Sequence, residues 1–194
     1  MKKLALVLIV LAAFVAPVFG GTLTVKVVPS TLEAGLPGEL QVEFWMQGTD
    51  TVTGILALPE FTLNGTNVTS SFSIKHDPRN VTFDGYDIKH NAAQWPAVFG
   101  FVVEDESATS FGFMDLAGRE VPVLDPVWLM TATYNYEPLV VGAYKIDTWD
   151  GSDPWWPPKF DVVPATFTVV PEPATIALLG VGLAGILVRR RKKE

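Results

Sequence analysis

Three aspartates recur at every third position in the segment Asp147-Thr148-Trp149-Asp150-Gly151-Ser152-Asp153. Ca²⁺ prefers several oxygen ligands of this type, so Asp147, Asp150 and Asp153 form a candidate calcium site. The segment lacks the D-x-D-x-D-G spacing and the distal glutamate of an EF-hand loop. A solvated acidic turn explains the same residues, and calcium is the one cofactor that the sequence leaves open.

Three tryptophans, Trp149, Trp155 and Trp156, lie in or next to this acidic segment and are followed by Pro157 and Pro158. Exposed indole rings stack on sugars, and a few of them can dominate a binding site. The same rings can instead fold back and cap the end of a domain. Residues 149–156 are therefore either a binding loop for a carbohydrate or protein, or a structural cap.

Catalytic groups are poorly supported by the sequence. The carboxylates of residues 104–106 are consecutive, so on a strand end they would point in alternating directions and not pair as glycoside hydrolysis requires. His76 and His90 show no short metal-binding spacing with the neighbouring Asp77, Asp84 and Asp87. There is no G-x-S-x-G motif and no cysteine, which excludes thiol chemistry. We expect the protein not to be an enzyme.

The charge distribution excludes one class of partner. Residues 21–170 hold seven basic and 19 acidic side chains, a formal charge of −12 within a chain whose total is −7. A surface this acidic repels polyphosphate, so nucleic-acid binding is not expected.

The elements that must position these groups are short strands. Residues 22–28 alternate apolar and polar side chains, and so do residues 40–46, where Gln41, Glu43 and Trp45 oppose the apolar set. Residues 128–136 place Trp128, Met130, Ala132, Tyr134 and Tyr136 on one face. Further strands are predicted at residues 54–58, 72–75, 97–104, 110–114, 142–149 and 165–170. About eight or nine short strands between Gly/Pro/Asp turns predict an all-β fold, an antiparallel β-sandwich.

Two apolar segments flank this domain. Lys2 and Lys3 precede an apolar run from Leu4 to Phe19, which is typical of a secretory signal peptide, with small residues Gly20 and Gly21 for cleavage. An N-terminal anchor is the alternative, although the run is shorter than the roughly 20 residues that a membrane span needs. At the other end Pro171-Glu172-Pro173 interrupts the chain before an apolar, Gly-rich run over 176–188 that predicts a transmembrane helix.

A basic cluster closes the chain: Arg189, Arg190, Arg191, Lys192 and Lys193. By the positive-inside rule this cluster stays cytoplasmic and stops the chain in the inner membrane, with the domain outside. The whole segment VPEPATIALLGVGLAGILVRRRKKE resembles the PEP-CTERM sorting signal of Gram-negative bacteria that make extracellular polysaccharide. The resemblance implies that Pro171, Glu172 and Pro173 are recognised by an exosortase, a membrane transpeptidase. A plain C-terminal anchor is the alternative.

The domain itself carries a looser resemblance. Leu23-Thr24-Val25, Val28-Pro29-Ser30, the turn over 35–38 and the late strands over 129–134 and 142–146 are similar to a cohesin-type or other immunoglobulin-like sandwich. We thus expect a signal peptide over 1–20, a sandwich over 21–168 and a sorting signal over 169–194. The predicted function is that of an exported cell-surface or matrix protein, structural or adhesive in association with exopolysaccharide. A binding module that uses the Trp-rich loop is the alternative.

Overall fold

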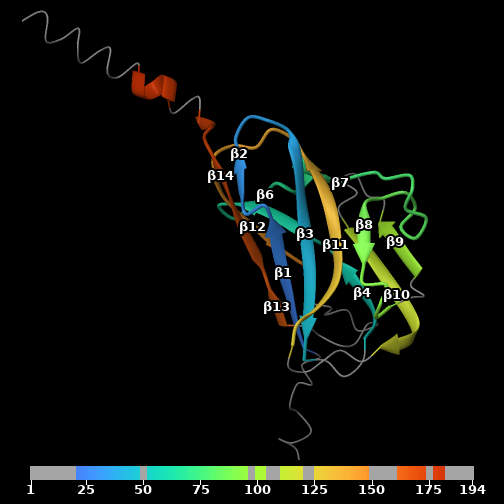
Figure 1. The fold of residues 1–194 in the computed structure, drawn as a ribbon. Helices are drawn as coiled ribbons and strands as arrows, with labels where there is room; N and C mark the ends of the chain where they lie inside the picture. The colour runs from blue at the N-terminus through green and yellow to red at the C-terminus, as the bar shows by residue number, and fades with distance from the viewer. Residues whose placement is uncertain are drawn as a thin grey trace, which may run out of the picture.

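The computed structural model describes residues 21–48, 52–95, 99–103, 110–119, 125–148, 161–173 and 177–181. These residues form fourteen strands, one short 3₁₀ helix and a helical stretch at residues 177–181 (Figure 1). The strands are β1 (Thr22–Val28), β2 (Thr31–Glu33), β3 (Gly38–Gln47), β4 (Val52–Ala57), β5 (Glu60–Leu63), β6 (Thr66–Asn67), β7 (Phe72–Ile74), β8 (Ile88–His90), β9 (Phe99–Val103), β10 (Ser110–Arg119), β11 (Val127–Tyr136), β12 (Gly142–Asp147), β13 (Asp161–Val163) and β14 (Ala165–Val170), with the helix η1 (Thr69–Ser71) before β7.

The strands make three sheets arranged as two layers. One layer is a six-stranded sheet with the order β13-β1-β3-β11-β7, in which β8 also pairs with β11. The other layer holds a five-stranded sheet, β2-β14-β12-β5-β6, and a three-stranded sheet, β4-β10-β9. Aromatic contacts join the layers, because Phe61 of β5 stacks on Phe72 of β7 and Phe111 of β10 meets Phe44 of β3 edge to face.

The prediction of a purely antiparallel sandwich is wrong in one respect, because two pairs of strands are parallel. β1 runs parallel to β13, and β14 runs parallel to β2. Pro29 and Pro164 have no backbone N–H to give to a sheet, and each interrupts an extended segment. Residues 22–33 at the start of the domain and residues 161–170 at its end therefore each cross from the six-stranded sheet to the five-stranded sheet. Their strands lie side by side and run parallel in both sheets.

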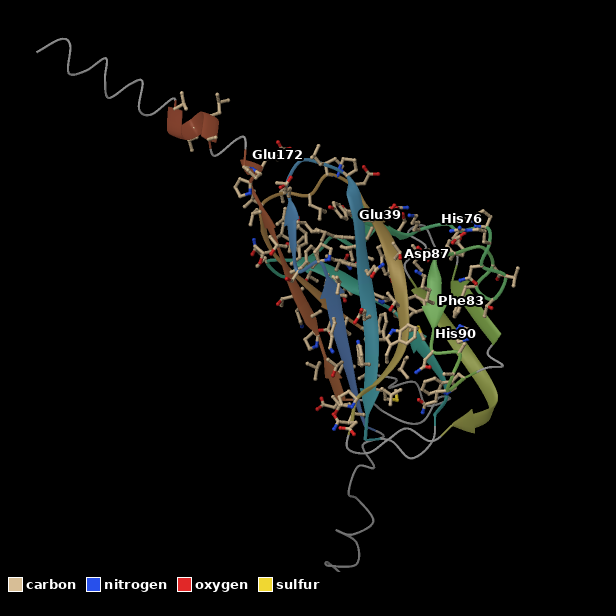
Figure 2. The ribbon with its side chains drawn as sticks, in the orientation of Figure 1. Glu39, His76, Phe83, Asp87, His90 and Glu172 are labelled. Atoms are coloured by element: carbon tan, nitrogen blue, oxygen red, sulfur yellow. The ribbon has the colours of Figure 1, made fainter. Side chains whose placement is uncertain are left out.

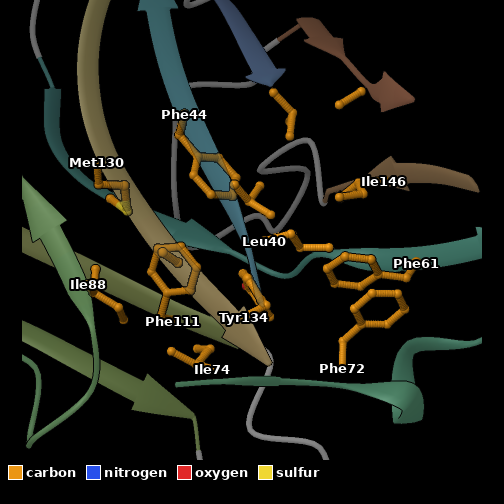
Figure 3. Close-up of a cluster of buried hydrophobic side chains, with 14 of the residues drawn as sticks. Leu40, Phe44, Phe61, Phe72, Ile74, Ile88, Phe111, Met130, Tyr134 and Ile146 are labelled. Atoms are coloured by element: carbon orange, nitrogen blue, oxygen red, sulfur yellow. The ribbon is translucent and has the colours of Figure 1, made fainter. Parts of the chain in front are cut away.

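The core lies between the layers and is built from alternate residues of the central strands (Figure 3). Leu40, Val42, Phe44 and Met46 of β3 are at most 1% exposed, as the period-two pattern predicted. Opposite them Phe61 contacts both Phe72 and Tyr134, with ring centroids 3.9 and 5.3 Å apart. The sandwich is thus held by aromatic side chains that reach across from both layers.

A β-bulge changes the predicted face of one residue. Trp128 of β11 lies opposite Trp45 of β3, whereas Met130 lies opposite Phe44, so Leu129 is the extra residue. Directly opposed residues share a face of the sheet, which puts Trp128 with Trp45 on the outer face. Met130, Ala132 and Tyr134 are buried as predicted, but Trp128 does not share their face.

Candidate functional site

The folded sandwich ends at the residue that precedes the Pro-Glu-Pro motif. Val170, the last residue of β14, lies opposite Glu33 of β2, and its carbonyl accepts a hydrogen bond of 2.8 Å from the backbone N–H of Ala34. Pro171 follows at once and is exposed. β14 lies between β2 and β12, and this end of the chain is paired with β12 as far as Val169 and with β2 as far as Val170.

A tight turn of the domain lies beside the motif. Gly35 has φ +82°, a conformation that favours glycine, and its N–H donates to the carbonyl of Leu139. A Cβ at Gly35 would lie 3.9 Å from a carboxylate oxygen of Glu172, so this side chain lies over the turn. Figure 2 shows Glu172 at this end of the sandwich, beyond β14. Glu172 is partly covered, whereas the two flanking prolines are exposed.

Beyond the motif, residues 177–181 are helical and lie away from the sheets (Figure 1). In the part of the chain that the structure describes, none of the helices has the length and hydropathy that crossing a membrane requires. The basic residues 189–193 and the predicted signal peptide lie outside the described residues. The transmembrane helix predicted over 176–188 is described only at 177–181.

The candidate calcium and tryptophan sites are described at one residue. Asp147 ends β12, where its carboxylate accepts hydrogen bonds from the Lys145 ammonium and from the backbone N–H of Thr148. Its partners Asp150 and Asp153, and the three tryptophans of 149–156, lie outside the described residues. Both sites stay predictions.

The two histidines lie in a segment that hydrogen bonds among its own residues organise. Asn80 fixes the turn, because its amide donates to the carbonyl of Ile88 and its side-chain oxygen accepts from the backbone of Thr82 and Phe83. Arg79 hydrogen bonds to Asp77 and lowers the pKa of that carboxyl to about 2. Among the described residues, no three histidine or acidic side chains come together as a metal site.

His76 and His90 contact aromatic rings in this segment. The His76 ring meets Tyr86 at 5.4 Å, and the His90 ring lies 6.1 Å from Phe83. Burial lowers the pKa of His90, partly offset by a hydrogen bond to the backbone of Trp95. Both histidine rings therefore pack against aromatic side chains of this segment.

A groove that sequence reasoning missed lies at the same end of the sandwich as the Pro-Glu-Pro motif. It has a volume of about 440 Å³ and lies where β3 begins, β11 ends and η1 leads into β7. Serine, asparagine, glutamate and tyrosine dominate its wall, which comprises Pro37, Gly38, Glu39, Ser70, Ser71, Phe72, Ser73, Asn135, Tyr136 and Glu137. These residues come from three separate parts of the chain, so no local motif could reveal the groove.

One wall of the groove depends on a glycine. Tyr136 lies directly opposite Gly38, and a Cβ at Gly38 would lie 2.5 Å from the Tyr136 hydroxyl oxygen. The tyrosine side chain therefore lies across the bare backbone of β3. Burial and the nearby carboxylate of Glu33 raise the pKa of Tyr136, so its hydroxyl stays a neutral donor.

Comparison with known proteins identifies the C-terminal segment. Residues 169–192 match the PEP-CTERM protein-sorting motif, which confirms the predicted sorting signal. The motif implies processing by an exosortase, with export and membrane anchoring before transfer to the cell surface. Among curated proteins, none matches the chain.

The sandwich is similar to solved cohesin structures. A non-cellulosomal cohesin from Archaeoglobus fulgidus is 12% identical with a TM-score of 0.46, covering 80% of this chain and 96% of that one. The seventh ScaB type I cohesin from Pseudobacteroides cellulosolvens is 8% identical with a TM-score of 0.44, covering 77% and 93%. The Coh-OlpC–Doc435 complex from Clostridium thermocellum contributes a chain 10% identical with a TM-score of 0.45, covering 77% and 94%.

Proposed function

We propose that this protein is a structural or adhesive component of the extracellular matrix, held there by association with exopolysaccharide after its sorting signal is removed. In this proposal the N-terminal segment 1–20 starts export. The apolar segment and basic cluster after residue 175 halt the chain in the inner membrane. Pro171, Glu172 and Pro173 are the residues that the exosortase recognises.

The position of the motif carries the proposal. The last strand bond of the domain is made at Val170, and the exposed Pro171 follows without a linker. A cut within or after the motif therefore removes the anchor and leaves all the described strands in place. This is what a sorting signal requires, because the cargo must stay folded when it is released.

The charge of the domain and the outer face of its six-stranded sheet support a role outside the cell. The charge also argues against a nucleic-acid partner. The formal charge of −12 over residues 21–170 favours solubility and repels other polyanions. The outer face of the six-stranded sheet adds aromatic side chains among polar ones, with the Lys26 ammonium 4.1 Å from the centre of the Trp45 ring and the Trp45 indole N–H donating to Glu43. An aromatic ring among polar groups offers a sugar both a flat apolar surface and hydrogen-bond partners.

Loss of the polysaccharide tests the matrix role. In a strain of the producing bacterium that makes no exopolysaccharide, we expect most of the mature protein to move from the cell-associated matrix to the medium, because its ligand is gone. Immunoblots of the matrix, membrane and medium fractions measure the distribution, and a second outer-surface protein without the motif serves as the control. An unchanged distribution of the mature protein would count against association with the polysaccharide.

A further inference from the structure

We propose that the groove at the start of β3 and the end of β11 binds a neutral, hydroxyl-rich segment of polysaccharide. The inference rests on the proposed function, since it supplies the contact by which the protein would associate with exopolysaccharide. It uses residues different from those of the tryptophan loop over 149–156.

The groove has a row of polar side chains that the sheet register fixes. Asn135 of β11 lies opposite Glu39 of β3 on one side and opposite Ser73 of β7 on the other. Strands lie about 4.8 Å apart, so the row spans about 10 Å across three strands. All three side chains are exposed. Groups carried on paired strands keep their spacing, as a preorganised binding site requires.

Two side chains of the row have donors and acceptors that are free to bind a ligand. Within the described parts of the chain, the side chains of Asn135 and Ser73 take part in no hydrogen bond or ion pair. The side-chain amide of Asn135 offers two N–H donors and one oxygen acceptor. The hydroxyl of Ser73 offers one donor and can also accept. Sugar hydroxyls likewise donate and accept, so neighbouring hydroxyls on a ring match this row.

The base of the groove is rigid. The N–H of Glu137 donates to the carbonyl of Ser71, and the N–H of Ser71 donates to the carbonyl of Val68, which fixes the serine segment against the end of β11. Phe72 is 1% exposed and anchors the same segment in the core. Tyr136 supports the base from the other face of the sheet, where its ring centroid is 6.5 Å from that of Phe72.

The charge of the groove selects among polysaccharides. Glu39 and Glu137 are both in its wall, and Glu33 lies near enough to Tyr136 to affect the pKa of its hydroxyl. The nearby ammonium of Lys75 is 2.7 Å from a carboxylate oxygen of Glu39 and is therefore already paired. The net charge is negative, so a polymer rich in uronate, sulfate or phosphate is repelled and a neutral one is not.

Equilibrium pull-down tests this assignment with the full chain in detergent micelles. The probes are the neutral and the anionic fractions of the exopolysaccharide of the producing bacterium, separated by anion exchange and immobilised. We expect the double variant Asn135→Ala/Ser73→Ala to bind the neutral fraction about tenfold more weakly, since it removes hydrogen bonds worth about that factor together. Gln41→Ala is the matched control, because it removes an exposed amide from β3 outside the groove.

Each outcome decides a different point. The groove is supported if the double variant binds more weakly than the unmodified chain while Gln41→Ala binds equally well. Both variants must also keep the thermal midpoint of the unmodified chain. Equal binding by the double variant and the unmodified chain overturns the groove while polysaccharide association stands. Stronger binding to the anionic fraction overturns the ligand class. Binding to neither fraction overturns both the groove and the polysaccharide association from which it was inferred.

Discussion

Replacing the three motif residues, as Pro171→Ala/Glu172→Ala/Pro173→Ala, is expected to leave the protein as an unprocessed chain in the inner membrane. The motif lies within residues 169–192, which match the sorting signal, and it follows directly on Val169 and Val170, the last residues of β14. We expect the processed fraction to fall by roughly tenfold or more, because a recognition element worth about 1.4 kcal/mol changes an equilibrium by that factor.

The matched control for this variant is Pro164→Ala. Pro164 is also an exposed proline, but it lies between β13 and β14 and outside the sorting signal. The fraction of processed chain is measured by immunoblot of membrane and surface fractions. Normal processing of the triple variant would contradict the role given to Pro171, Glu172 and Pro173, whichever way the control behaves.

The triple substitution also separates sorting from folding. Pro171 and Pro173 are exposed, and the pairing of β14 with β2 ends at Val170. We therefore expect the thermal midpoint of the sandwich to stay the same. A loss of processed protein at an unchanged midpoint is then a loss of recognition and not of structure.

The largest expected effect on stability comes from Phe61→Ala. Phe61 is 0% exposed and stacks on Phe72 at 3.9 Å, so it joins the five-stranded sheet to the six-stranded one. Removing a buried phenylalanine ring costs about 3–5 kcal/mol, because burial is lost and a cavity remains. The free energy of unfolding of small domains is about 5–15 kcal/mol in total, so this variant is expected to lose a large part of its stability.

Chemical denaturation measures this prediction, with the free energy of unfolding taken from the midpoint and slope. Val81→Ala is the control, since Val81 is 90% exposed and its truncation is expected to change the free energy by about 0.5 kcal/mol at most. A loss below about 1 kcal/mol for Phe61→Ala would show that the two layers are not held together by this aromatic cluster.

Much of the fold follows from period-two alternation. The bounds predicted for Thr22–Val28 and Ala165–Val170 are those observed, and the strands predicted at 40–46 and 128–136 are each found within one or two residues. These strands are buried on one face, so their sequence shows the alternation clearly. Trp45 lies on the outer face as its place in the pattern predicted.

The strands that were missed are short. β2, β5, β6, β8 and β13 have two to four residues each, too few to show an alternation clearly. β6 forms a tight hairpin with β5, whereas the positions of the others depend on backbone pairing with strands distant in sequence. The parallel pairs have the same origin, because the direction of β13 beside β1 depends on how the two ends of the domain meet.

The bulge at Leu129 shows how one extra residue defeats a pattern. Trp128 fits the alternation of Met130, Ala132 and Tyr134 in sequence, but the bulge reverses its direction. Its indole N–H donates to the hydroxyl of Thr131, another outer-face residue. No local signal marks the bulge, because Leu129 is an ordinary strand residue and is itself buried.

The two candidate sites differ in how far the sequence reveals them. The sorting signal is a continuous segment in which motif, apolar run and basic cluster follow in order, so the order of residues is enough to recognise it. The groove combines residues from positions 37–39, 70–73 and 135–137, which only the fold brings together. Its polar residues look like ordinary strand ends and turns in sequence.

Intact mass spectrometry of the protein recovered from the producing bacterium tests the central claim most directly, together with fractionation of the cells. The account predicts a mature chain that begins near Gly21, ends within residues 171–173 and is found outside the inner membrane. A chain that retains its residues to Glu194 and stays in the inner membrane would contradict it, and would leave the sandwich as the outward-facing domain of an anchored protein.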